Sequence, residues 1–202
     1  NVGKSDNEFT YTLNEGTLKG NYDITTEVGK LEVKASSEID KNITLTTANV
    51  EQKYDGKTYT AGTATATDSK GGAVKVEYSA DGGKTWTTDL TTIAAKNVSE
   101  SKTIQVRATS ENYEGEVTGT QKLTITKREV KLTSASDEKV YDGTPLTNST
   151  VTVTGEGFVT GEGASYNVTG SQTNVGKSDN EFTYTLNEGT LEGNYAITYK
   201  TG

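Results

Sequence analysis

The chain of 202 residues contains no cysteine, no histidine and no methionine, and it has a single proline. Without cysteine there is no disulfide, no thiol nucleophile and no Cys-ligated zinc. Without histidine the chain lacks the commonest general base and the commonest transition-metal ligand. These absences argue against an enzyme, and we assign no catalytic, cofactor-binding or metal-binding residue from the sequence.

Apolar residues and positive charge are also scarce. Only 30% of the residues are apolar, and the formal net charge is −8 with an isoelectric point near 4.7. The acidic balance disfavours nucleic acid and anionic membranes as partners. No run of about 18 apolar residues is present, so no segment is expected to enter a membrane. Apolar content this low approaches that of disordered chains, but eleven tyrosines, one tryptophan and a regular alternation of apolar residues with threonine indicate a folded chain.

One stretch of 25 residues occurs twice. Residues 174–198 repeat residues 1–25 without a gap and differ only at Lys19 against Glu192 and at Asp23 against Ala196. The copies lie 173 residues apart, which is too long for one coil of a solenoid and fits a tandem array of small domains. Because it begins inside a repeat and shows no signal peptide, the chain is expected to be part of a longer protein.

A second internal match predicts the boundaries between domains. Residues 43–46 and the motif Tyr54-Asp55-Gly56 recur 87 residues later, as residues 130–133 and Tyr141-Asp142-Gly143. The expected parts are the C-terminal half of a preceding repeat at residues 1–38, a complete domain at 39–127, and a second domain at 128–202 that lacks its last strand.

Short segments of alternating apolar and polar residues, separated by Gly, Asn and Asp turns, predict strands throughout the chain. They lie at residues 9–13, 22–24, 31–33, 43–46, 62–67, 74–78, 85–87, 103–108, 122–126, 130–133, 151–153, 166–168, 182–186 and 195–197. Tyr78, Tyr184 and Tyr195 are expected to face inward, whereas Lys75 and Glu77 are expected to face outward. The number and spacing of these strands predict an all-β chain of tandem immunoglobulin-like antiparallel β-sandwich domains in an elongated array.

The predicted junction between the two domains has no flexible-linker composition. Residues 123–132 read LTITKREVKL, with no Pro, Gly or Ser between the last strand of one domain and the first strand of the next. Gly/Ser-rich linkers are loose, so this junction predicts a stiff connection. The single proline, Pro145, follows a Gly-Thr pair, where a turn or an edge strand tolerates its missing N–H.

Four motifs of the last part carry a resemblance to a known family. They are Tyr-Asp-Gly-Thr-Pro-Leu-Thr at 141–147, Gly-Ser-Gln-Thr-Asn-Val-Gly at 170–176, Phe-Thr-Tyr-Thr-Leu at 182–186 and Gly-Asn-Tyr-Ala-Ile-Thr at 193–198. The chain resembles the immunoglobulin-like, mostly-β, glycine-rich (MBG-type) tandem repeats of Gram-positive cell-surface proteins and adhesins. Residues 78–86 and 106–113 resemble the sister repeat that alternates with it.

The resemblance implies an extracellular, cell-wall-attached stalk. We therefore expect a non-enzymatic structural stalk or spacer segment of a bacterial surface adhesin, which projects a distal binding domain from the cell wall. Its expected partners are neighbouring repeats of the same protein, and a host glycan or protein ligand is expected to bind through other domains. The alternative is a carbohydrate-binding accessory module of a secreted or surface protein, which requires aromatic side chains that are exposed and coplanar.

The segment Ser79-Ala-Asp81-Gly-Gly-Lys-Thr-Trp86 fits the Asp-box pattern S-x-D-x-G-x-x-W of sialidase-type propellers. The functional interpretation is a glycosidase, but those enzymes carry several such boxes and an arginine cluster, whereas Arg107 and Arg128 are the only arginines here. The structural interpretation is a hairpin in which the Asp81 side chain caps the turn backbone and Trp86 covers it. We predict the structural role.

Two further chemistries are open from the sequence. An intramolecular bond between Lys131 and Asn194, assisted by Glu188, would stiffen a stalk, although Glu188 also reads as an exposed turn residue. Acidic turns at Asp68 and at residues 179–181 are candidates for Ca²⁺ at domain junctions, although neither has the spacing of an EF-hand loop. The sequons at Asn42, Asn97, Asn148 and Asn167 are expected to be unmodified.

The leading residues also predict self-association. The apolar face of Phe9, Tyr11 and Leu13 belongs to a half-domain whose first half is missing, and an unpaired sheet edge attracts another strand. Residues 1–35 are therefore expected to dock on the opening half of the last domain of another molecule, which gives a strand-swapped dimer or a head-to-tail chain.

Overall fold

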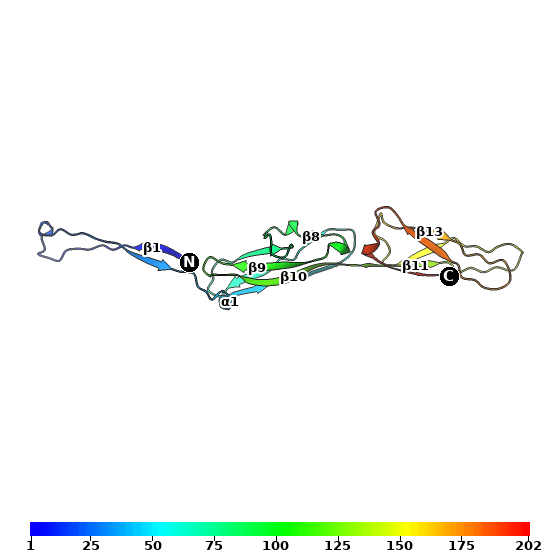
Figure 1. Cartoon of the computed structure of the whole chain (residues 1–202), viewed down its shortest axis with the longest axis horizontal. Coiled ribbons are helices and arrows are strands. Elements are labelled where there is room, and N and C mark those ends of the chain that lie inside the picture. Colours follow the sequence, from blue (N-terminus) through cyan, green and yellow to red (C-terminus); the bar gives the residue numbers. More distant parts are fainter.

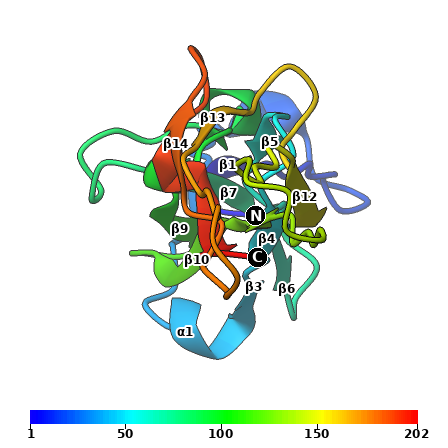
Figure 2. The ribbon, with the colours of Figure 1, turned by 90° about the vertical axis from the view of Figure 1, so that its right-hand side faces the viewer.

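The structure, a computed structural model, describes all 202 residues. Strands account for 41% of the residues and helices for 8%, so the expectation of an all-β chain is confirmed. Figure 1 shows an elongated molecule in which three stretches of chain follow one another along the long axis. We call them the leading segment (residues 1–38), the middle segment (39–127) and the trailing segment (128–202). The end-on view of Figure 2 shows them superposed along that axis.

The leading segment is a thin arm that points away from the rest of the molecule (Figure 1). Strand β1 (Gly3–Asn7) pairs antiparallel with β2 (Gly29–Val33), and a 3-10 turn, η1 (Lys19–Asn21), lies in the connection. The strand at 31–33 is thus confirmed, but the strands expected at 9–13 and 22–24 are wrong. Those residues have no strand partner, and Phe9 and Tyr22 are 55% and 61% exposed.

The middle segment contains three sheets. A four-stranded sheet has the order β4-β10-β9-β7, and two small sheets pair β3 with β6 and β5 with β8. In chain order the elements are α1 (Ile39–Asn42), β3 (Ile43–Thr46), β4 (Val50–Lys53), β5 (Tyr59–Thr60), β6 (Thr65–Asp68), β7 (Lys75–Ser79), η2 (Leu90–Thr92), β8 (Ala94–Ala95), η3 (Val98–Glu100), β9 (Lys102–Thr109) and β10 (Val117–Thr126). No helix in the structure has the length and apolar character needed to cross a membrane.

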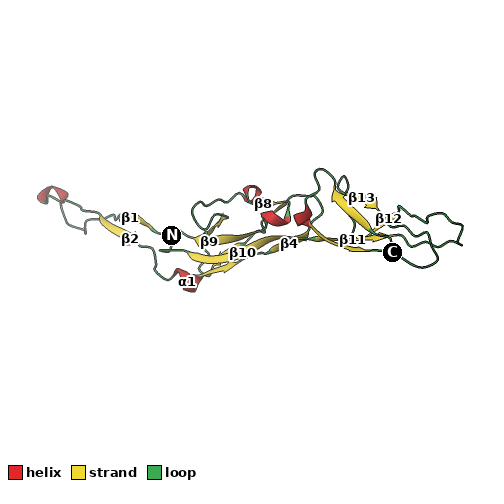
Figure 3. Cartoon of the chain, turned by 45° about the vertical axis from the view of Figure 1, so that its right-hand side comes forward, coloured by secondary structure: helices red, strands yellow, loops and turns green.

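The trailing segment contains a three-stranded sheet of order β12-β11-β15 and a pair, β13-β14. Its elements are β11 (Arg128–Ser134), β12 (Val151–Gly155), β13 (Ala164–Val168), β14 (Phe182–Leu186), η4 (Glu192–Asn194) and β15 (Tyr195–Lys200). Only Lys127 separates β10 from β11, so the chain passes from the middle to the trailing segment almost without leaving extended conformation (Figure 3). The absence of a loop at the predicted junction is confirmed.

The expectation of purely antiparallel pairing is wrong at two places. Strand β4 runs parallel to β10, and β15 runs parallel to β11. In both segments a crossover connection brings the second strand of the pair alongside the first, which a two-residue hairpin cannot do. The other seven strand pairs are antiparallel.

The main hydrophobic core is a single cluster that continues across Lys127. Its 14 buried residues come from both the middle and the trailing segment, and include Tyr54, Ile104, Leu132 and Tyr195. Buried inward residues alternate along β9 and the second half of β10, as the pattern predicts: Ile104, Val106, Ala108, Leu123 and Ile125. The inward positions at the start of β10, Val117 and Gly119, are half-buried. Because the cluster crosses the boundary, burial of apolar surface holds the two segments to each other as well as within themselves.

One predicted orientation is wrong. Glu77 was expected to face outward, but only 9% of the residue is exposed. Its carboxylate accepts a hydrogen bond from Arg107 Nε at 3.0 Å and lies 2.7 Å from Lys75 Nζ. These two cations compensate for the loss of water around the carboxylate. Lys75 and Arg107 thereby lower the pKa of Glu77, with the Lys75 contact as the largest cause.

Candidate functional site

The joint between the middle and trailing segments is the best-built polar site in the molecule. It forms where the end of β4 and the turn η3 of the middle segment meet η4, the start of β15 and the loop after β12 of the trailing segment. Side chains that lie far apart in the sequence therefore converge beside the β10–β11 connection. We call this set of contacts the joint: Lys53, Tyr54, Asn97, Val98, Glu156, Val159, Glu162, Asn194 and Tyr195.

Two tyrosines from the two segments share one carboxylate at the centre of the joint. The hydroxyl of Tyr54 donates a hydrogen bond to one oxygen of Glu162, and the hydroxyl of Tyr195 donates to the other at 2.7 Å. The rings of Tyr54 and Tyr195 lie 5.5 Å apart and nearly perpendicular, and both residues are 2% exposed. Such an edge-to-face aromatic pair adds to the free energy of area burial.

This arrangement raises the pKa of both phenols. Burial is the main cause for Tyr54, and the hydrogen bond to the Glu162 carboxylate adds to it, so that its pKa rises to about 12. Burial also raises the pKa of Tyr195, although the Val159 N–H, which donates to its hydroxyl at 3.1 Å, acts in the opposite direction. The joint therefore requires neutral tyrosines.

A second contact, which we call the Asn clasp, lies at the edge of the joint. The Asn194 side chain, in a residue that is 1% exposed, accepts a hydrogen bond from the Val98 N–H at 3.0 Å. Its amide nitrogen donates to Asn97 Oδ1 at 2.8 Å. Both functional groups of the buried amide are thus used across the boundary, as burial of a polar side chain requires.

Charged groups close the rim of the joint. Lys53 Nζ lies 3.0 Å from a Glu156 carboxylate oxygen across the boundary. Within the trailing segment, Arg128 donates to the backbone carbonyls of Gly157 and Glu156 at 2.7 and 2.6 Å, which holds this loop against β11. The exposed ion pair contributes little by itself, so the buried tyrosines and the Asn clasp carry most of the joint's stability.

Comparison with known proteins finds no matching family model, no matching curated protein and no matching solved structure. The joint's role must therefore be inferred from its geometry.

The Asp-box segment forms a turn, as its structural interpretation predicts. The Asp81 carboxylate accepts hydrogen bonds from the backbone N–H groups of Lys84 and Thr85, both at 3.0 Å, and from the hydroxyls of Ser79 and Thr85. These donors, with the Ser79 hydroxyl first, hold its pKa far below the usual range. Trp86 donates from its ring nitrogen to the Gly83 carbonyl at 3.1 Å, and the Arg107 guanidinium lies 4.3 Å from its ring centroid.

The residues considered for an intramolecular Lys–Asn bond do not converge. Asn194 is committed to the Asn clasp, and Glu188 is exposed in the turn after β14. Lys131 is exposed on β11 and pairs in register with Thr198 of β15. Thr198 lies four residues after Asn194 in the chain, so Lys131 is not opposite Asn194. The interpretation of Glu188 as a turn residue agrees with this geometry.

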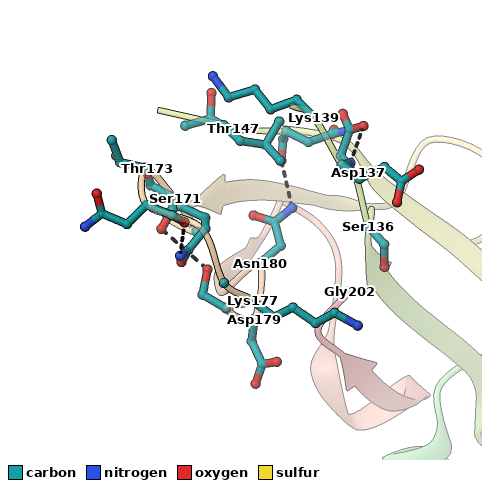
Figure 4. A pocket seen from close by; sticks show the side chains of 18 of the residues that line it. Ser136, Asp137, Lys139, Thr147, Ser171, Thr173, Lys177, Asp179, Asn180 and Gly202 are labelled. Atoms are coloured by element: carbon teal, nitrogen blue, oxygen red, sulfur yellow. Dashed lines mark hydrogen bonds between the residues drawn. The ribbon is translucent and has the colours of Figure 1, made fainter. Parts of the chain in front are cut away.

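The calcium candidates lie in two different settings. The Asp68 carboxylate accepts hydrogen bonds from the Lys70 and Gly72 N–H groups and from the Tyr113 hydroxyl at 2.9 Å. Asp179 and Glu181 are exposed, while Asn180 donates to the Ala135 and Asn148 carbonyls and ties two loops together (Figure 4). No group of three or more acidic, His or Cys residues is arranged to hold a metal ion.

Sequence reasoning missed the joint, although part of its signal was visible. In the sequence Tyr54-Asp55-Gly56 is visible only as a repeated motif, and no pattern marks Glu162. The sequon residue Asn97 lies in the Asn clasp, whereas Asn42, Asn148 and Asn167 lie outside the joint. Tyr-Asp-Gly and Asn-Tyr both recur in the middle and trailing segments, but only the fold shows that the two motifs meet.

The joint predicts unequal effects at two equivalent glycines. Gly56 and Gly143 occupy the same motif with φ of +81° and +76°, so alanine at either costs about 1 kcal/mol of backbone strain. A Cβ at Gly56 would also lie 2.9 Å from Val159 Cγ1 across the boundary, whereas a Cβ at Gly143 meets nothing. We expect Gly56→Ala to lower the free energy of unfolding by about 1–3 kcal/mol more than Gly143→Ala, as measured by urea denaturation. Equal losses would show that the Gly56–Val159 contact is unimportant.

Proposed function

We propose that this chain is a non-enzymatic stalk segment of a bacterial surface adhesin, attached to the cell wall and built from immunoglobulin-like β-sandwich domains in tandem. In this proposal residues 39–127 and 128–202 are two such domains, and residues 1–38 belong to a preceding one. Its partners are neighbouring repeats of the same protein, and its task is to hold a distal binding domain at a distance from a Gram-positive cell. The internal repeat, the elongated shape and the acidic, cysteine-free composition support it.

The observation that carries the proposal is the joint. A spacer must resist bending, and bending between these segments would separate the buried Tyr54–Tyr195 pair and break the Asn clasp. The one-residue connection at Lys127 leaves little slack to absorb such a motion. Stiffness therefore arises from non-covalent contacts, in a chain that has no cysteine for a disulfide.

The most deeply buried tyrosines favour a stalk over a carbohydrate-binding module, although Tyr11, Tyr22, Tyr141 and Tyr199 are exposed. Tyr54, Tyr78 and Tyr195 are between 2% and 4% exposed, so their ring faces are not available to stack on a sugar. Glycan-array binding by the full chain discriminates between the two functions. We expect no saturable signal, and a clear one would favour the carbohydrate-binding alternative.

Stiffness can be measured directly because the chain has no native cysteine. Spin labels at Thr103→Cys on β9 and Thr183→Cys on β14, both exposed positions, report the distance between the middle and trailing segments. We expect double electron–electron resonance to give one narrow distance distribution. Addition of Tyr54→Ala, which removes the aromatic pair and one donor to Glu162, should broaden it.

The matched control is Tyr141→Ala in the same labelled chain. Tyr141 occupies the equivalent Tyr-Asp-Gly motif but is 61% exposed at the far end of the trailing segment, so its removal should leave the distribution narrow. A broad distribution in the otherwise unmodified labelled chain would contradict the stalk proposal.

A further inference from the structure

The Asn clasp occurs twice in the chain. At the near end of the middle segment, Asn112 repeats the role of Asn194: its Oδ1 accepts from the Val2 N–H at 3.1 Å, and its Nδ2 donates to Asn1 Oδ1 at 3.4 Å. In both places the contact joins two residue pairs. The side chain of the asparagine in an Asn-Tyr pair forms hydrogen bonds with an Asn-Val pair that comes earlier in the chain. The contact is therefore a reusable connection.

The tyrosine that follows each of these asparagines also has an equivalent environment. The Tyr113 hydroxyl donates to the Asp68 carboxylate at 2.9 Å, as the Tyr195 hydroxyl donates to Glu162. Each carboxylate lies in the same segment as its tyrosine. The near ends of the middle and trailing segments thus present the same three groups: an asparagine amide, a tyrosine and a carboxylate.

The middle segment contributes the other side of the joint, which we call the receiving side because it contacts Asn194 and Tyr195. It has two parts, the Asn97-Val98 pair and the loop Tyr54-Asp55-Gly56. In this loop Asp55 accepts from the N–H two residues ahead at 2.9 Å, and Asp142 does the same in Tyr141-Asp142-Gly143. The two glycines have nearly the same positive φ. The loop that places Tyr54 against the next segment is therefore already formed at Tyr141.

The far end of the trailing segment carries both receiving parts together. Tyr141, Asn174 and Val175 line one cavity of about 770 Å³, which Figure 4 shows from close by. Val175 is 90% and Tyr141 61% exposed. Residues 174–180 are identical to residues 1–7, the stretch that begins with the Asn-Val pair bound to Asn112. The pair that receives Asn112 at one end of the chain is thus present, uncovered, at the other.

We propose that the far end of the trailing segment, Tyr141–Gly143 with Asn174–Val175, binds the Asn112–Tyr113 face of a second copy of this chain, so that copies associate head to tail. In the acceptor copy Asn174-Val175 replaces that copy's own Asn1-Val2 on Asn112. Because the contact joins two different surfaces, it does not close on itself and can extend to longer chains. This inference rests on the repeated clasp and goes beyond the proposed stalk function.

Competition within the chain sets the strength of this association. Asn1-Val2 is tethered beside Asn112, so it competes at a high effective concentration. The unmodified chain should therefore associate weakly. A substitution that weakens the contact of Asn1-Val2 with Asn112 should strengthen association. The same substitution in the Asn174-Val175 pair should remove the association.

The test uses matched proline substitutions in the full chain. Proline has no N–H, so Val2→Pro deletes the internal donor to Asn112, and Val175→Pro deletes its counterpart in a residue that is 90% exposed. In sedimentation equilibrium we expect Val2→Pro to lower the dissociation constant for self-association by about tenfold, the value of one hydrogen bond. Val2→Pro/Val175→Pro and Val2→Pro/Asn112→Ala should return to the mass distribution of the unmodified chain.

Circular dichroism of each variant checks that the fold is retained. If Val2→Pro leaves self-association unchanged, or if it increases association that Val175→Pro does not reverse, the proposal is wrong. The second of these results would instead favour strand swapping through residues 1–35. Neither result bears on the distance distribution across the joint, so failure here is distinguishable from failure of the stalk proposal.

Discussion

Tyr195→Ala should lower the free energy of unfolding by about 3–5 kcal/mol, the usual cost of removing a buried aromatic side chain. Tyr195 is 2% exposed and donates a hydrogen bond to Glu162. Its ring centroid lies 5.5 Å from that of Tyr54 and 5.1 Å from that of Phe158. The substitution removes all of these and leaves a cavity at the boundary between the middle and trailing segments. Urea denaturation followed by tryptophan fluorescence and circular dichroism measures the loss.

The repeat supplies an internal control for this variant. Tyr22 lies at the equivalent position of the first copy of the 25-residue stretch, within Gly-Asn-Tyr, but it is 61% exposed. Tyr22→Ala should change the free energy of unfolding by no more than about 0.5 kcal/mol. Similar losses in both variants would mean that intrinsic strand preference, and not burial at the joint, makes this tyrosine important.

Alkaline pH should open the joint as its two buried phenols ionise. The pKa of Tyr54 is raised to about 12, and that of Tyr195 is also raised, from an unfolded value near 10. A group with a raised pKa stabilises the fold fully below its unfolded pKa, and the contribution disappears as the pH rises through the folded pKa. The loss should therefore fall between about pH 10 and pH 12, because ionised phenols cannot donate to Glu162.

Tyrosinate absorbance and the spin-label distance distribution together check this expectation. Tyr54 and Tyr195, whose pKa values are raised above the ordinary phenol value, should remain un-ionised in the folded chain at about pH 10. The distance distribution across the joint should broaden only when Tyr54 and Tyr195 ionise. If Tyr54 and Tyr195 both ionise near pH 10 while the distribution stays narrow, the Tyr54–Glu162–Tyr195 contact does not hold the joint.

Local patterns were enough to predict much of the architecture. The alternation Ile104, Val106 and Ala108 correctly places three fully buried side chains on β9, because the side-chain period of a strand is two wherever it forms. The junction at 123–132 correctly predicts two strands with almost nothing between them. The Asp-box turn at Asp81 was also predictable, since all its hydrogen bonds are made within a few residues.

Contacts over long sequence distances were not predictable in this way. Glu162 receives hydrogen bonds from Tyr54 and Tyr195, and no local pattern marks it as the residue on which they converge. The parallel pairs β4–β10 and β11–β15 were missed for the same reason, because alternation identifies a strand without naming its partner. The alternation predicts that Glu77 faces outward, and its burial depends on two cations beside its carboxylate, Lys75 on the same strand and Arg107 on β9.

The repeated stretch shows most directly what the sequence determines and what the tertiary structure determines. By sequence alone, residues 1–25 and 174–198 are the same element, and their near identity determines that the chain is repetitive and that both copies have the same strand preferences. In the trailing copy Phe182–Leu186 forms β14 because Ala164–Val168 lies beside it. The same five letters at residues 9–13 form no strand, while Gly3–Asn7, whose counterpart at 176–180 is not in a strand, pairs with Gly29–Val33. A strand needs a neighbour for its backbone N–H and C=O groups, and the neighbour is supplied by the tertiary structure.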